Sequence, residues 1–87
     1  MSKQITIYST THCPYCKSLK SWLEGQDIPF DYKVVDTDPK LMEEYESVRD
    51  GQIGVPFTVI KDENGTVEKI LGFDKQKFRK ALNIPMF

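Results

Sequence analysis

The sequence lacks a long hydrophobic run and carries almost no net charge. Its first apolar stretch stops after Tyr8, which is too short for the hydrophobic region of a secretion signal, and no other stretch is long enough to span a membrane. The formal net charge of −1 offers no basic stripe for nucleic acid. We therefore expect a cytoplasmic protein that binds neither a membrane nor nucleic acid.

Cysteine is also scarce, and its spacing restricts what it can do. The chain has two cysteines, Cys13 and Cys16, and one histidine, His12. A structural zinc site needs about four ligands, so a monomer falls short and we expect no metal. A bond between Cys13 and Cys16 would close almost no loop and would add little stability. In a reducing compartment, this spacing is typical of catalysis or metal binding rather than of a structural disulfide.

The sequence has no internal repeat, no low-complexity tract and no linker. Its 87 residues have room for one compact core, so we expect a single domain over residues 1–87 that works as a monomer. Acidic side chains outnumber basic ones in residues 24–50, whereas basic ones outnumber acidic ones in residues 69–80. This separation indicates two solvated faces or a docking surface for a protein partner.

Hydrophobic periodicity predicts four strands and three helices. The β-rich runs predict strands at residues 4–8, 30–35, 57–61 and 66–71. Apolar residues at helical spacing predict helices from residue 14 to about 24, from 39 to near 51, and from 75 to 82. Gly25 is the expected stop of the first helix, and residues 83–85 are the expected stop of the last.

Turn and capping residues support the same boundaries. Asp38 before Pro39 is typical of a helix start, and so is Asp74 with Phe73 and Phe78 placed as a hydrophobic staple. Asn64-Gly65 predicts a tight hairpin turn between the last two strands. The order is β-α-β-α-β-β-α, an α/β layout with a parallel first pair of strands and an antiparallel last pair. It resembles the thioredoxin-like fold, a four-stranded mixed sheet with helices on both faces.

The cysteine pair sits where the first strand gives way to the first helix. With Cys13 as the N-cap and Pro14 as the first helical residue, the Cys13 sulfur faces unpaired amides and the positive end of the helix dipole. Both favour the thiolate, which is the form that attacks a disulfide, provided that substrate can reach the sulfur. Cys16 lies one turn further along, on the face of Leu19 and Leu23. It should be the more buried cysteine and should resolve the mixed disulfide.

Three neighbouring residues each have two interpretations. Tyr15 either covers a thiol substrate at the lip of the site or is a plain surface tyrosine. His12 either supports the thiolate or is an ordinary loop histidine. Pro56, directly after Val55, either serves strand entry or forms a cis peptide that exposes the Val55 backbone to substrate.

The motifs together resemble those of the glutaredoxins. Cys13-Pro14-Tyr15-Cys16, then Gly54-Val55-Pro56-Phe57, then Gly72-Phe73-Asp74 follow the order and spacing of that family. The resemblance implies a cis peptide at Pro56 and a glutathione groove. It also implies thiol–disulfide oxidoreductase activity on protein or glutathione mixed disulfides, with glutathione as co-substrate and no bound cofactor. The groove would be formed by Tyr15, the backbone of Val55, and residues 72–74.

Glutathione would have further contacts in this sequence. The amides of Phe73 and Asp74, at the start of a helix, would hold the γ-glutamyl carboxylate, and Gln52 would add a hydrogen bond. The chain departs from the family pattern in three places. Leu71 replaces the first glycine of a Gly-Gly pair, Phe73 replaces a small residue, and Thr10 replaces a basic one.

These departures bring the chain nearer the NrdH-type redoxins. Such redoxins take electrons from thioredoxin reductase and pass them to ribonucleotide reductase. Two features argue against this alternative. The NrdH-type redoxins tend to have other residues between the cysteines, and they tend to have a Trp-Ser-Gly-Phe segment near the end, which this sequence lacks. Two further alternatives are a cluster-binding module, with iron and sulfur bridged between two chains, and a binding domain without catalysis. Pro14 disfavours the cluster.

Overall fold

The computed structural model describes residues 3–82 and confirms the order of elements. The strands are β1 (Gln4–Ser9), β2 (Asp31–Val34), β3 (Phe57–Lys61) and β4 (Val67–Leu71); the helices are α1 (Pro14–Gly25), α2 (Pro39–Val48) and α3 (Lys75–Leu82). A short 3₁₀ helix, η1, spans Val35–Thr37. Within the described range, each helix is too short or too polar to cross a bilayer. The expected stop of α3 at residues 83–85 lies outside the described residues.

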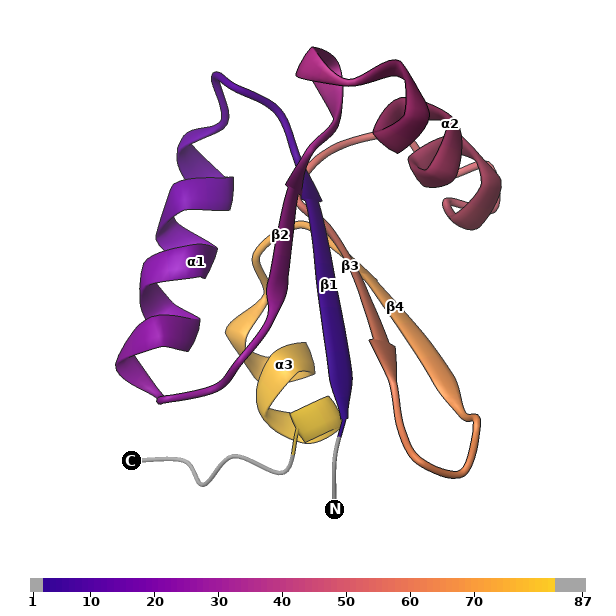
Figure 1. The fold of residues 1–87 in the computed structure, drawn as a ribbon. Coiled ribbons are helices and arrows are strands. Elements are labelled where there is room, and N and C mark those ends of the chain that lie inside the picture. The colour runs from indigo at the N-terminus through magenta and orange to yellow at the C-terminus, as the bar shows by residue number, and fades with distance from the viewer. Residues whose placement is uncertain (1–2, 83–87) are drawn as a thin grey trace.

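The four strands form one mixed sheet in the order β2-β1-β3-β4. β1 and β2 run parallel and β3 and β4 run antiparallel, as expected; β3 is also antiparallel to β1. Figure 1 shows α1 and α3 on one side of this sheet and α2 on the other. Helices therefore cover both faces.

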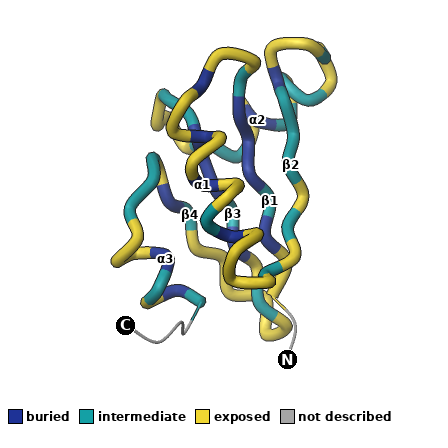
Figure 2. Tube along the Cα trace, turned by 90° about the vertical axis from the view of Figure 1, so that its left-hand side faces the viewer, coloured by how far each residue is buried: buried dark blue, intermediate teal, exposed yellow. Residues whose placement is uncertain are grey.

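Two hydrophobic clusters follow from the alternation of side chains along the strands. On one face, Ile5 and Ile7 of β1 pack with Leu19 and Leu23 of α1 and with Phe78 of α3. On the other face, the packed residues are Tyr8, Val35, Tyr45 and Phe57. Figure 2 shows buried residues running along β1, which therefore contributes to both cores.

The structure shortens two predicted elements. β2 covers Asp31–Val34 instead of residues 30–35, because its pairing with β1 ends at Ser9 and Val34 and the chain then enters η1. α2 ends at Val48, earlier than the predicted end near Gly51. Asp50 and Gly51 have φ values of 52° and 80°, which a right-handed helix excludes.

Two turns also differ from the sequence prediction. Gly25 is part of α1, and the left-handed residue that follows the helix is Asp27, with φ 57°. In the hairpin, the Gly65 amide donates to the Asp62 carbonyl at 3.1 Å, and Gly65 has a φ of 87°. Asp62 Oδ1 also accepts from the amides of Asn64 and Thr66. The loop is therefore longer than a two-residue Asn-Gly turn, and β4 starts one residue later than predicted.

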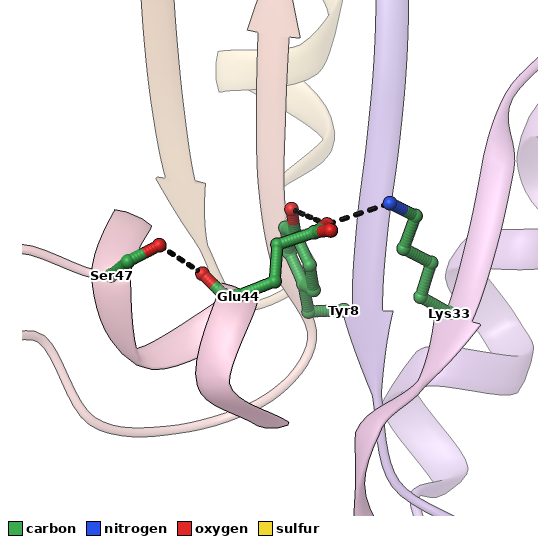
Figure 3. A network of polar contacts seen from close by, with 4 residues as sticks. All are labelled: Tyr8, Lys33, Glu44 and Ser47. Carbon is green, nitrogen blue, oxygen red and sulfur yellow. Dashed lines mark hydrogen bonds and ion pairs between the residues drawn. The ribbon is translucent and has the colours of Figure 1, made fainter. Parts of the chain in front are cut away.

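A polar network ties α2 to the sheet (Figure 3). Glu44 Oε2 accepts a hydrogen bond from the Tyr8 hydroxyl and an ion-paired one from Lys33 Nζ, both at 2.6 Å. The Ser47 hydroxyl donates to the Glu44 carbonyl on the same helix. Lys33 and Tyr8 lower the pKa of Glu44, whereas burial and the Glu44 contact raise the pKa of Tyr8. One carboxylate thus joins β1, β2 and α2.

Replacing Glu44 with Gln should lower the free energy of unfolding at pH 7 by about 0.2–1 kcal/mol, because the lost ion pair is partly exposed. The lowered pKa of Glu44 means that its contribution is present above the ordinary glutamate pKa and is lost as pH falls through the folded value. Denaturant unfolding of both proteins at neutral and strongly acidic pH measures this. Glu43→Gln, an exposed neighbour, is the control. An equal effect of Glu44→Gln at both pH values would show that the charged Glu44 carboxylate does not stabilise the fold.

Candidate functional site

The strand register gathers the predicted site segments at one end of the sheet. Tyr8 pairs with Phe57, and Phe57 pairs with Leu71, so the second-to-last residue of β1 and the last residue of β4 lie level with the first residue of β3. The loops that follow β1 and β4 and the loop that precedes β3 therefore leave the sheet at the same end (Figure 1). These loops carry Cys13, Gly72 and Val55 respectively.

Cys13 is the N-cap of α1, as predicted. Its backbone is extended, with φ −133° and ψ 96°, and Pro14 is the first helical residue. Pro14 brings no amide hydrogen, so the first turn offers the amides of Tyr15 and Cys16 as unpaired donors. The Cys16 amide donates to Cys13 Sγ at 3.1 Å. The sulfur therefore lies against a helix start, where a negative charge is favoured.

The two cysteines form a disulfide, with their Cα atoms 5.2 Å apart. Cys16 has no exposed surface, and Cys13 retains an exposed fraction of 6%. The prediction that Cys16 is the more buried of the two is confirmed. In this oxidised form, all the exposed surface of the pair belongs to Cys13.

Asp36 anchors the loop in front of Cys13. Its carboxylate accepts hydrogen bonds from the Thr11 amide and the Thr11 hydroxyl, at 3.0 to 3.1 Å. Asp36 lies in η1, so the 3₁₀ helix that follows β2 holds the segment that follows β1. Sequence reasoning missed this contact, because an aspartate among several acidic residues gives no sign of its partner.

The segment around Val55 is fixed on both sides. The peptide bond between Val55 and Pro56 is cis, as the family resemblance implied. Tyr45 of α2 uses its hydroxyl twice, donating to the Gly54 carbonyl at 2.9 Å and accepting from the Gly54 amide at 3.1 Å. The Gly72 amide donates to the Pro56 carbonyl at 2.7 Å. Among residues 3–82, no hydrogen bond uses the Val55 backbone, which stays available to an extended substrate.

Gly54 is the residue that this geometry requires. Its φ is 139°, which side-chain residues rarely adopt, and an added Cβ would lie 3.3 Å from Leu71 Cδ1. Gly54 therefore lies close against Leu71, the last residue of β4. The role of the Tyr45 hydroxyl gave no signal in the sequence.

The remaining predicted residues surround this core of the site. Tyr15 points outward with an exposed fraction of 70%, and Gln52 is exposed in the loop before Val55. Asp74 Oδ1 accepts from the amides of Gln76 and Lys77, which confirms it as the N-cap of α3. Phe73 is half-buried, with its ring centroid 5.8 Å from that of Trp22.

Ile53 is an exposed apolar residue that sequence reasoning also missed. Its exposed fraction is 81%, the highest among the large hydrophobic residues described. The available signal was an isoleucine that stands between a polar residue and a glycine, outside any periodic pattern.

For metal binding, the described part of the chain contains no group of three or more His, Cys, Asp or Glu residues that could hold an ion.

Comparisons with known proteins agree with this geometry. The family model described as glutaredoxin matches residues 5–64, more than half of the chain. Mycoredoxin 1 of Corynebacterium glutamicum is 43% identical over 58 residues, which cover 67% of this chain and 71% of that protein. The glutaredoxin-like protein NrdH of Lactococcus lactis is 38% identical over 39 residues, covering 45% and 54% of the two chains.

A solved structure shows the same fold. The crystal structure of the glutaredoxin from Methanosarcina mazei matches with a TM-score of 0.77 at 29% identity. The match covers 93% of this chain and 79% of that one. The predicted thioredoxin-like architecture is therefore confirmed.

Replacing Tyr45 with Phe should increase hydrogen exchange at the Gly54 amide about five- to tenfold, the factor expected for one lost hydrogen bond. Nuclear magnetic resonance measures this exchange residue by residue. Tyr8→Phe is the matched control, because its ring packs in the same aromatic cluster, 5.9 Å from that of Tyr45, but its hydroxyl bonds to Glu44. Equal exchange at Gly54 in all three proteins would show that Tyr45 does not hold this loop.

Proposed function

Because the chain belongs to the glutaredoxin family, whose members are thiol–disulfide oxidoreductases, we propose that it reduces protein disulfides and glutathione mixed disulfides through Cys13 and Cys16. The observation that carries this proposal is the place of Cys13 Sγ at the start of α1, where the Cys16 amide donates to it at 3.1 Å. A reduced Cys13 would meet the same donor. Its thiolate would therefore be stabilised.

The reaction proceeds in two exchanges. In the first, the Cys13 thiolate attacks one sulfur of the substrate disulfide, whose bond breaks and releases the other sulfur as a thiolate. In the second, the Cys16 thiolate attacks Cys13 Sγ, forms the Cys13–Cys16 disulfide and releases the second substrate thiol. The substrate gains the two electrons that the cysteine pair loses. The Cys13–Cys16 disulfide in the structure corresponds to the product of the second exchange.

The backbone of Val55 is the proposed docking edge for the substrate. Its free amide and carbonyl suit an extended peptide or the cysteinyl part of glutathione. Pro56 completes this edge, and Pro14 stiffens the loop between the cysteines. Tyr15 covers the apolar part of the thiol, and Gln52 adds a hydrogen bond. Residues 72–74 supply the amides of Phe73 and Asp74 for a carboxylate.

Cysteine variants test the assignment of the two exchanges. Cys16→Ser should accumulate a mixed disulfide between Cys13 and the substrate, because the resolving thiol is gone, whereas Cys13→Ser should lose all reductase activity. Mass spectrometry of acid-quenched reactions detects the trapped species. In reduced protein, thiol titration should find the pKa of Cys13 well below the ordinary thiol value, because its sulfur lies at the helix start, and that of Cys16 higher. Equal and unperturbed values for both would contradict the mechanism.

The electron donor has two candidates in a reducing cytoplasm, where we expect the protein to act. Glutathione is the donor that the family resemblance favours. Thioredoxin reductase, with ribonucleotide reductase as acceptor, is supported by the likeness to the NrdH protein and by Thr10, which offers no positive charge to a glutathione carboxylate. The ring of Phe73, packed against Trp22, likewise replaces the small residue of the glutathione loop.

Turnover with glutathione and its reductase, compared with turnover with thioredoxin reductase, separates these donors. We expect glutathione to support turnover with a high KM, and Thr10→Lys to lower that KM about fivefold through a new contact with a carboxylate. Thr66→Lys adds the same charge in the distant β3–β4 hairpin and is the control. If thioredoxin reductase supports turnover and glutathione does not, the donor is thioredoxin reductase, as in the NrdH-type redoxins.

A further inference from the structure

A pocket next to the site takes no part in the two proposed thiol–disulfide exchanges, although it shares Phe73 with the loop 72–74. It lies between α1 and the start of α3, has a volume of about 510 Å³, and is lined by Lys17, Ser18, Ser21, Trp22, Phe73 and Lys75. We call it the α1–α3 pocket. Two of its lining residues, Phe73 and Lys75, lie in the basic segment 69–80.

The pocket adjoins the site at both of its walls. On α1, Lys17 lies one turn beyond Cys13, and its amide donates to the Cys13 carbonyl at 3.2 Å. Cys13, Lys17 and Ser21 follow one another at four-residue spacing, so the pocket continues along the stripe of α1 that begins at the cysteine. On the other wall, Phe73 follows Gly72, whose amide bonds to the Pro56 carbonyl.

The charge of the pocket has a single sign. Its lining contains two exposed lysines, two hydroxyls and no carboxylate. Lys75 Nζ lies 5.7 Å from the centre of the Phe73 ring, and the Arg79 guanidinium lies 6.0 Å from that of Trp22, which adds a third cation behind the lining. Asp74, the acid next to the pocket in sequence, directs Oδ1 to the amides of α3.

The aromatic rings shape what this basic pocket can accept. Trp22 and Phe73 have ring centroids 5.8 Å apart, and both are half-buried. They present apolar surface between Lys17 and Lys75, suited to the methylene groups of a side chain that ends in a carboxylate. A fully solvated inorganic anion would leave that surface unused.

We propose that the α1–α3 pocket docks an acidic segment that flanks the disulfide of a protein substrate. The inference rests on the proposed function and names the substrate class that the site prefers. An acidic residue a few positions from the substrate cysteine would contact Lys17 and Lys75 while that cysteine lies at Cys13. The pocket would thus select among protein disulfides and leave small disulfides unaffected.

Matched peptides test this selection. Two peptides carry the same disulfide to a small thiol, one flanked by Asp and Glu and the other by Asn and Gln. Reduced protein is mixed with each, and oxidation of the Cys13–Cys16 pair is followed by mass spectrometry of quenched samples. The acidic peptide should react about fivefold faster, as expected for two exposed charge contacts, and added salt should remove the difference. Lys17→Gln with Lys75→Gln should bring the ratio close to one.

Two controls separate this proposal from its premise. Lys61→Gln with Lys80→Gln removes the same charge outside the pocket lining and should keep the acidic preference. Glutathione disulfide should react equally with the pocket variant and the original protein. Equal rates for the two peptides, or an equal loss in the control variant, would overturn the pocket proposal alone. A slower reaction of glutathione disulfide in the pocket variant would assign the pocket to glutathione and overturn it too. Absence of reaction with every disulfide would overturn the proposed function itself.

Discussion

The pairing of β3 between β1 and β4 is the constraint on which the site depends. The row from Tyr8 through Phe57 to Leu71 sets where three loops leave the sheet. A slip of one residue would turn the inward side chains of a strand to the opposite face, so both hydrophobic clusters resist it. The same packing that stabilises the core therefore keeps Cys13, Val55 and Gly72 at one end of the sheet.

Hydrogen bonds from outside the sheet then hold the loops at this end of the sheet in place. Asp36 holds the loop before Cys13, Tyr45 holds Gly54, and the Gly72 amide holds Pro56. The first two contacts join a loop to η1 and to α2, and the third joins two loops. The Val55 backbone stays unpaired within the described residues because its neighbours on either side are fixed. Fixing the neighbours while leaving one residue free would reduce the ordering cost of the substrate binding proposed at Val55.

The two faces of the sheet serve different purposes. The face with α2 carries the ion pair of Glu44 with Lys33 and the aromatic cluster of Tyr8, Tyr45 and Phe57, which together position the loop before β3. The face with α1 and α3 carries the cysteine pair and the basic α1–α3 pocket. The uneven distribution of charge along the sequence thus becomes a difference between regions of the surface. Chemistry and proposed substrate selection share one side of the molecule.

Much of the fold and the chemical centre was predictable, because the interactions involved are local. Cys13 as N-cap, Pro14 after it, and Cys16 one turn on depend on residues within four positions of one another. Asp74 follows the same logic. The resemblance to glutaredoxins added the cis peptide at Pro56, for which composition alone gives little support.

The tertiary structure decided what distant residues do to each other. Thr11 lies in the loop after β1 and Asp36 in η1, and the hydroxyl of Tyr45 meets Gly54 only when α2 packs on its face of the sheet. Likewise, Lys17 and Lys75 share a pocket because α1 and α3 cover the same face. The sequence by itself determined the order of elements and the place of the cysteine pair, since periodicity and capping act between near neighbours. Packing and register selected the partners across the fold, because many pairings are compatible with the same local pattern.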